Sequence, residues 1–206
     1  MRYGMLLDPN KCVGCGACVI ACKKSHLTPP NIYWSNIITT EEGTYPNAKV
    51  LFTQTQCMHC EDAPCVTNCP TGASYHDEHG RVQIDADRCI GCRTCINACP
   101  YGARHFNHQD PEEYSYWETG GKMPFEKYNQ TKHVKGTVSK CVMCNDRVDE
   151  GLLPECVQAC ITESRIFGNL DDPQSKITRE ITRLNAKPMK EELGTKPSLF
   201  FVPRKV

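Results

Sequence analysis

The sequence lacks a long apolar segment and an excess of charge of either sign. Its longest apolar runs are Cys18 to Cys22 and Leu199 to Val202. Both are far shorter than the roughly 18–20 residues that a membrane-spanning helix needs. The 24 Lys and Arg residues balance 24 Asp and Glu residues, so the formal net charge is zero. The short apolar runs predict no direct membrane span. Because nucleic-acid binding draws on a surplus of basic residues, the balanced charge predicts no nucleic-acid partner.

Export signals are also missing from the N-terminal residues. Met1 to Leu7 contain one basic residue, Arg2, and then Asp8 and Pro9 follow before a long apolar region develops. A secretory signal has such a region, and a twin-arginine signal has two adjacent arginines. The sequence therefore predicts a chain that does not direct its own export.

Motifs for catalysis are absent as well. The sequence has no Ser–His–Asp order, no phosphate-binding loop and no G-x-G-x-x-G with the appropriate flanks. Of the seven His residues, His59 attracts notice because it lies between Cys57 and Cys60, where it could donate a hydrogen bond to sulfur. We expect no catalytic site on this chain.

Cysteine is the residue that the sequence has in abundance. Hydrophobic residues make up only 39% of the 206 residues even with the 16 cysteines included. This low apolar content implies that metal or disulfides supply part of the stability. The cysteines form four groups of four, with none left over: Cys12, Cys15, Cys18 and Cys22; Cys57, Cys60, Cys65 and Cys69; Cys89, Cys92, Cys95 and Cys99; Cys141, Cys144, Cys156 and Cys160.

All four groups open with C-x2-C and close with C-x3-C. Groups one and three read C-x2-C-x2-C-x3-C, whereas group two has four residues in the middle gap and group four has eleven. This is the run of bacterial ferredoxins with two [4Fe–4S] clusters, in which the fourth cysteine ligates the other cluster. Pro70 and Pro100 match the C-P ending of that run, and Lys23 and Ile161 depart from it. Glycines between the ligands, such as Gly91, permit the tight turns that the loops require.

Two other interpretations of the cysteines are weaker. A disulfide framework would place three thiols in one short loop, where neighbouring pairs would be strained and arbitrary. Structural zinc uses two C-x2-C pairs or Cys with His, and group four alone could pass for half of such a site. The third cysteine of groups one and three does not fit tetrahedral zinc. The spacing therefore favours iron–sulfur clusters.

The two-cluster rule predicts that cysteine groups exchange their fourth ligands. All sixteen cysteines then bind iron in four [4Fe–4S] clusters. We name each predicted site after the group that supplies three of its ligands. The sites are site one (Cys12, Cys15, Cys18 and Cys160), site two (Cys57, Cys60, Cys65 and Cys99), site three (Cys89, Cys92, Cys95 and Cys69) and site four (Cys141, Cys144, Cys156 and Cys22).

This exchange predicts an α+β fold with two bacterial-ferredoxin-like units, each with two clusters. Groups two and three are neighbours in the sequence, and groups one and four must meet in space. The second unit, residues 51–101, is therefore expected to be inserted into the first unit, residues 1–50 and 102–206. The first unit also holds a loop over residues 103–138 and a C-terminal extension. That loop region is rich in aromatic residues, which suits either a partner surface or a cover over a cluster.

Short strands are expected to flank the cysteine groups, and a helix and a strand to follow them. The helix spans residues 172–185, with Asp172 as its cap and Ile177, Ile181 and Leu184 on one apolar face. The strand at residues 198–202 could dock on the body of the protein or on a partner. The predicted strands are Tyr3 to Leu7, Val50 to Thr55 and a hairpin of Ser74 to His76 with Arg81 to Asp85.

Together these motifs resemble a known family. Asp8 to Cys22, Cys57 to Cys65 and Cys89 to Gly102 are similar to the four-cluster iron–sulfur subunit of the molybdopterin-dependent dimethyl sulfoxide reductase superfamily. That superfamily includes polysulfide, thiosulfate, tetrathionate and arsenate reductases. Gly168 to Lys176 and Leu193 to Pro197 most resemble the polysulfide and arsenate reductase branch. The likeness covers nearly the whole chain except residues 103–138.

The resemblance implies an electron-transfer subunit in an anaerobic respiratory oxidoreductase. The expected partners are a large catalytic subunit with a molybdenum or tungsten bis-pterin cofactor, and a membrane anchor, quinone or cytochrome. Site one is expected nearest the catalytic subunit and site three at the far end. Some relatives carry Trp in place of Cys92 and hold a three-iron cluster, but this chain keeps the cysteine.

The resemblance leaves the compartment open between two possibilities. Such subunits are exported with their partner to the periplasmic side, on the partner's signal, or remain cytoplasmic, and are peripheral to the membrane in either case. The alternative function is a free polyferredoxin that shuttles electrons between several partners. A free shuttle is usually markedly acidic, whereas this chain is neutral, which favours a fixed partner.

Overall fold

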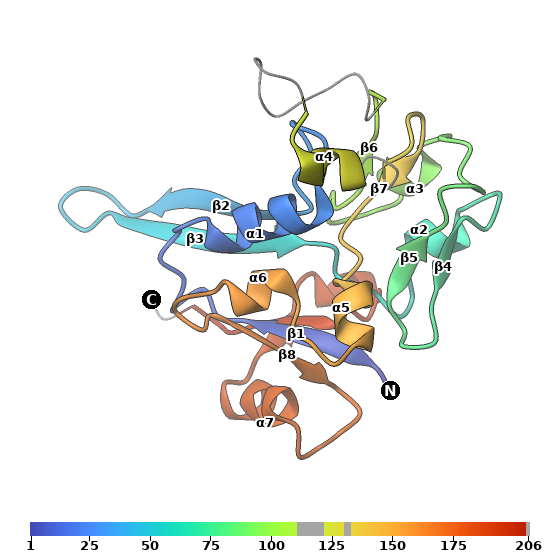
Figure 1. Ribbon diagram of the computed structural model, residues 1–206. Helices are drawn as coiled ribbons and strands as arrows, with labels where there is room; N and C mark the ends of the chain where they lie inside the picture. Colours follow the sequence, from blue (N-terminus) through green and yellow to red (C-terminus); the bar gives the residue numbers. More distant parts are fainter. Residues whose placement is uncertain (111–121, 130–132, 205–206) are drawn as a thin grey trace.

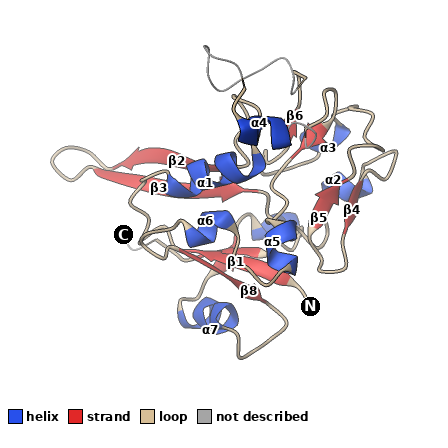
Figure 2. Ribbon diagram, in the orientation of Figure 1, coloured by secondary structure: helices blue, strands red, loops and turns tan. Residues whose placement is uncertain are grey.

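The protein is a mixture of short helices and short strands (Figures 1 and 2). The structure is a computed structural model that describes residues 1–110, 122–129 and 133–204. Its elements in chain order are β1 (Tyr3–Leu7), α1 (Ala17–His26), β2 (Ser35–Glu42), β3 (Lys49–Gln56), α2 (Pro64–Thr67), β4 (Ser74–His76), β5 (Val82–Ile84), α3 (Thr94–Asn97), β6 (His105–Phe106), α4 (Pro124–Asn129), β7 (Val138–Ser139), α5 (Asn145–Asp149), α6 (Glu155–Gln158), β8 (Arg165–Asn169), α7 (Lys176–Arg183), β9 (Lys187–Pro188), a 3-10 helix (Glu191–Leu193) and β10 (Leu199–Phe201).

A four-stranded sheet in the order β8-β1-β10-β9 places the first and last strands of the chain side by side. β1 pairs antiparallel with β8 and parallel with β10, where Met5 lies opposite Leu199. The side chains of β1 alternate between the two faces of the sheet. Met5 and Leu7 belong to the core that contains cysteines, and Leu6 belongs to a second core with Ile177 of α7. The C-terminal strand therefore docks on the body of the protein.

Helix α7 covers the face of this sheet opposite to α6 (Figure 1). Its predicted apolar face is confirmed, because Ile177 is fully buried and Ile181 and Leu184 pack against the same core. The predicted start and cap are wrong. The helix begins later than predicted, and the Ser175 hydroxyl accepts a hydrogen bond from the Thr178 amide. Asp172, the expected cap, instead accepts a hydrogen bond from the Gln174 amide in the turn before the helix.

The remaining strands form three two-stranded sheets. β2 and β3 make a long hairpin that extends away from the rest of the molecule (Figure 1). β4 and β5 form the predicted hairpin between groups two and three. β6 and β7 pair the ends of the predicted loop at residues 103–138. Most of the aromatic part of that loop lies outside the described residues, so its role stays a prediction.

Candidate iron–sulfur sites

A separate helix carries the third cysteine of each group, and Figure 2 shows these helices, α1, α2, α3 and α6. In each group the third cysteine is the second residue of a helix, and the fourth follows four residues later. One helical turn therefore separates two ligands of the same group. The helices are α1 with Cys18, α2 with Cys65, α3 with Cys95 and α6 with Cys156.

Helix pairs bring the groups together in space. α1 packs on α6, and α2 packs on α3. As a result the Cys22 thiol interacts electrostatically with Cys141, Cys144 and Cys156, although it lies on the same helix as Cys18. The Cys18 thiol in turn has the thiols of groups one and four around it, Cys160 among them. Groups one and four therefore meet, as expected.

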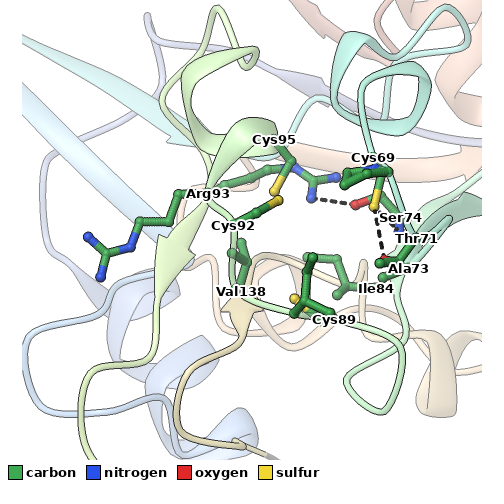
Figure 3. A pocket seen from close by; sticks show the side chains of 14 residues that line it. Cys69, Thr71, Ala73, Ser74, Ile84, Cys89, Cys92, Arg93, Cys95 and Val138 are labelled. Carbon is green, nitrogen blue, oxygen red and sulfur yellow. Dashed lines mark hydrogen bonds between the residues drawn. The ribbon is translucent and has the colours of Figure 1, made fainter.

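The same exchange occurs between groups two and three. The Cys60 thiol interacts electrostatically with Cys57, Cys65 and Cys99. Cys69, the fourth cysteine of group two, lines a cavity together with the first three cysteines of group three (Figure 3). Figure 3 shows the side chains of these four cysteines around one space, with Arg93 pointing away from it. Each fourth cysteine thus lies near the other group of its pair.

The arrangement of the thiols favours a multi-iron cluster over disulfides or a single metal ion. All sixteen cysteines are free of disulfides. Among the described residues, no three His, Cys, Asp or Glu side chains converge closely enough to hold a single metal ion. Four sulfurs around a wider space suit a multi-iron cluster, whose ligands bind different metal atoms. The disulfide and zinc interpretations are accordingly not supported by this arrangement.

Burial controls the ionisation of the thiols in the absence of iron. It raises the pKa of Cys60 and of Cys144 to about 12, so both would be protonated near neutral pH. At Cys69 burial also raises the pKa, but donors at Ser74 and Thr71 outweigh it and lower the pKa to about 7. A buried thiol becomes a thiolate when it binds metal, so cluster assembly must release protons from these sites.

Hydrogen-bond donors surround several of the sulfurs. The Ser74 amide donates to Cys69 Sγ over 3.4 Å, and the Met143 amide donates to Cys141 Sγ over 3.4 Å. His26 Nε2 lies 3.2 Å from Cys144 Sγ. Such donors raise the reduction potential of iron–sulfur clusters and orient their ligands. The local structure therefore resembles the environment of bound clusters.

Comparisons with known proteins agree with this geometry. Models described as a 4Fe-4S dicluster domain match residues 11–73, 48–115 and 109–170. The chain is 40% identical to the iron–sulfur subunit of an arsenate respiratory reductase from Shewanella sp. strain ANA-3, over 98% of this chain and 96% of the relative. It is 37% identical to a polysulfide reductase chain from Wolinella succinogenes, over 99% of this chain and 95% of the relative. It is also 40% identical to a selenate reductase subunit from Mesobacillus selenatarsenatis, over 98% of this chain and 72% of the relative.

The chain belongs to the family of iron–sulfur subunits of molybdopterin oxidoreductases. The resemblance predicted from the sequence is thus confirmed. Members of this family are iron–sulfur subunits of oxidoreductase complexes, and this chain is likewise an electron-transfer subunit. Its two dicluster domains are ferredoxin-like and bind [4Fe–4S] clusters. Within the described residues, no helix has both the length and the apolarity that crossing a bilayer requires.

Some features of this iron–sulfur subunit were not predicted from its sequence. Arg104, Lys140 and Arg165 are buried among the cysteines, and the spacing of basic residues gave no signal for them. Neither ring nitrogen of the buried His59 has a hydrogen-bond partner among the described residues, and its tuning role stays a prediction. The position of His26 next to the Cys144 sulfur was not predicted.

A tight approach of two loops at Gly91 gives a testable consequence. Gly91 has a φ of +68°, and a Cβ there would clash with the Gly136 carbonyl oxygen. We expect Gly91→Ala to displace the first loop of site three and to lower the iron content and the midpoint of thermal unfolding, because both strain and a backbone clash are introduced. Gly102→Ala is the matched control, since Gly102 has a φ of +61° and open space around it. Equal effects of the two substitutions would contradict the predicted clash.

Proposed function

We propose that this chain relays electrons through four [4Fe–4S] clusters between a catalytic subunit and a second redox partner. The catalytic subunit carries a molybdenum or tungsten bis-pterin cofactor, and the other partner is a membrane anchor, quinone or cytochrome. The relatives named above are subunits of arsenate, polysulfide and selenate reductases, which supports a role in anaerobic respiration. The direction of electron flow follows from the catalytic subunit.

The observation that carries this proposal is the continuous series of cysteine sites. Thiols of sites one and four interact through Cys18 and Cys156. Thiols of sites four and two interact through Cys141 and Cys57. Site two adjoins site three through the side chain of Arg104. An order of site one, site four, site two and site three forms a single path through the protein, which suits transfer between partners at its two ends.

The ligand sets themselves are part of the proposal. The pairing of α1 with α6 and of α2 with α3 supports the exchange of fourth cysteines. The insertion of residues 51–101 into a unit of residues 1–50 and 102–206 is supported by the pairing of β1 with β8, which joins the segments on either side of the insertion. α2, α3, β4 and β5 gather at one end of the molecule (Figure 1), as an inserted unit would.

Metal analysis of the native complex tests the proposal. The complex is isolated without oxygen through a tag on this chain, and its iron, molybdenum and tungsten are measured. We expect at least about sixteen irons per copy of this chain, because four cubane clusters hold four irons each, together with stoichiometric molybdenum or tungsten.

The alternative function gives a different result. A free polyferredoxin would carry about the same iron without molybdenum or tungsten. It would also migrate alone, without a large partner. That outcome would overturn the proposed catalytic partner while leaving the cluster sites intact.

A further inference from the structure

Three basic side chains are buried among the cysteines without an acidic partner. Arg104, Lys140 and Arg165 are 4%, 1% and 3% exposed. Within the described part of the chain, no carboxylate lies within ion-pair distance of any of them. Arg81 is also 3% exposed, but it binds the carboxylates of Asp77 and Asp149. Because a buried charge is costly without a counter-charge, the three cations require another source of negative charge.

Arg165 lies between site one and site four. Its guanidinium donates to Gln56 Oε1 over 2.6 Å and to Ser35 Oγ over 3.2 Å, and both acceptors are neutral. Its Nε is buried and has no hydrogen-bond partner among the described residues. Burial lowers the pKa of Arg165, but thiols of both sites, Cys156 and Cys18 first among them, outweigh burial and raise the pKa above its usual value. The thiols of these two sites are therefore the nearest source of negative charge.

Lys140 lies between site four and site two. Its ammonium donates to the carbonyl oxygens of Val82 and Cys141. Burial lowers its pKa, and the thiols of Cys57, Cys141 and Cys65 oppose that effect. These thiols belong to two neighbouring sites, and Cys57 and Cys141 lie in the same buried cluster, so the ammonium lies at the boundary between the two sites.

Arg104 lies between site two and site three. Its guanidinium donates to Ser74 Oγ over 2.8 Å and to Cys65 Sγ over 2.9 Å. Its Nε is buried, and no described residue accepts a hydrogen bond from it. Besides Cys65 of site two, it interacts with Cys95 of site three. Each boundary between consecutive sites in the series is thus occupied by one buried cation.

We propose that Arg165, Lys140 and Arg104 are fixed counter-charges that raise the reduction potentials of the two clusters on either side of each of them. This proposal rests on the proposed ligand sets. When an electron moves between neighbouring clusters, one is oxidised, the other is reduced, and no bond or proton is exchanged. Added negative charge is stabilised by a nearby positive charge, and a dry interior screens that interaction little. A cation at each boundary therefore also reduces the repulsion between electrons on adjacent clusters.

Removal of one charge at a time tests this proposal. The variants are Arg165→Gln, Lys140→Met and Arg104→Gln, and the readout is the midpoint potential of each cluster, titrated by electron paramagnetic resonance in the purified complex. We expect each variant to lower the reduction equilibrium constants of its two adjoining clusters by about tenfold, equivalent to about 59 mV for a one-electron couple. Arg165→Gln should leave the cluster of site three unchanged, and Arg104→Gln should leave that of site one unchanged.

Two kinds of control separate charge from packing. Arg165→Lys and Arg104→Lys keep the charge and should retain most of the original potential, and they also provide a result if a neutral variant fails to assemble. Arg147 is the matched basic residue, since it lies near Cys144 but is half-buried and paired with Glu155 at 2.7 Å. Arg147→Gln also removes one positive charge, but from a partly exposed side chain that water screens, so it should shift the potentials much less than the loss of a buried cation does.

Results that contradict the counter-charge proposal can be distinguished from results that contradict the proposed ligand sets. Potentials that do not move in a variant with full iron content would overturn the counter-charge proposal. Equal shifts in the Lys and Gln variants would overturn it too, because the cause would then be packing. Fewer than four clusters in the unsubstituted protein would instead overturn the proposed ligand sets.

Discussion

Replacement of Cys22 by Ser should remove the cluster of site four and leave that of site one in place. Cys22 lies one turn from Cys18 on α1, yet its thiol has Cys141, Cys144 and Cys156 around it. We expect iron content to fall by about one quarter, since one of four clusters is lost. Electron transfer between the two partners should nearly stop, because site four lies inside the series. Iron analysis, electron paramagnetic resonance and turnover of the complex measure these effects.

Cys18→Ser on the same helix is the matched comparison. It should remove the cluster of site one and leave that of site four. If both substitutions removed the same cluster, the exchange of fourth cysteines would be refuted. This pair of variants therefore decides between crossed and uncrossed ligand sets without reference to the catalytic partner.

Removal of iron should unfold most of the chain. Two groups of buried core side chains contain cysteines, among them Cys60, Cys65, Cys141 and Cys156. The proposed metal sites therefore occupy much of what would otherwise be a hydrocarbon core. Structural zinc sites in peptides contribute about 10–16 kcal/mol, and whole domains are stable by only about 5–15 kcal/mol. Loss of four clusters therefore exceeds the net stability that a domain has available.

The test is anaerobic chelation followed by circular dichroism and limited proteolysis. We expect loss of the native near-ultraviolet signal and rapid cleavage throughout the chain. Reconstitution with iron and sulfide should restore both properties. A chelated protein that kept a cooperative unfolding transition would contradict a cluster-dependent core.

The parts of this protein that the sequence predicts are those determined by local spacing. The intervals between cysteines indicate the cluster loops, and the alternation and apolar face of local segments indicate β1 and α7. The start of α7 was missed, because Asp172 and Ser175 are both good caps and tertiary packing selects between them.

The buried cations could not have been predicted in the same way. Nothing in the sequence distinguishes Arg104 or Arg165 from the rest of the 24 Lys and Arg residues. Their importance arises from burial between segments that are distant in sequence, such as the contact of Arg104 with Cys65. The contact of His26 with Cys144 is of the same kind, because it joins α1 to a loop more than half the chain away.

The position of β10 in the sheet determines when the sheet can be completed during synthesis of the chain. β1 is made first, but its two neighbours are residues 165–169 and 199–201. A ribosome adds about 5–20 residues per second, so β1 remains an unpaired edge for most of translation. In the proposed ligand sets, sites one and four need residues up to Cys160, whereas sites two and three need only residues 57–99. The N-terminal cysteine loop can therefore close only after Cys160 has been made, and β1 gains both of its neighbours only after residue 201.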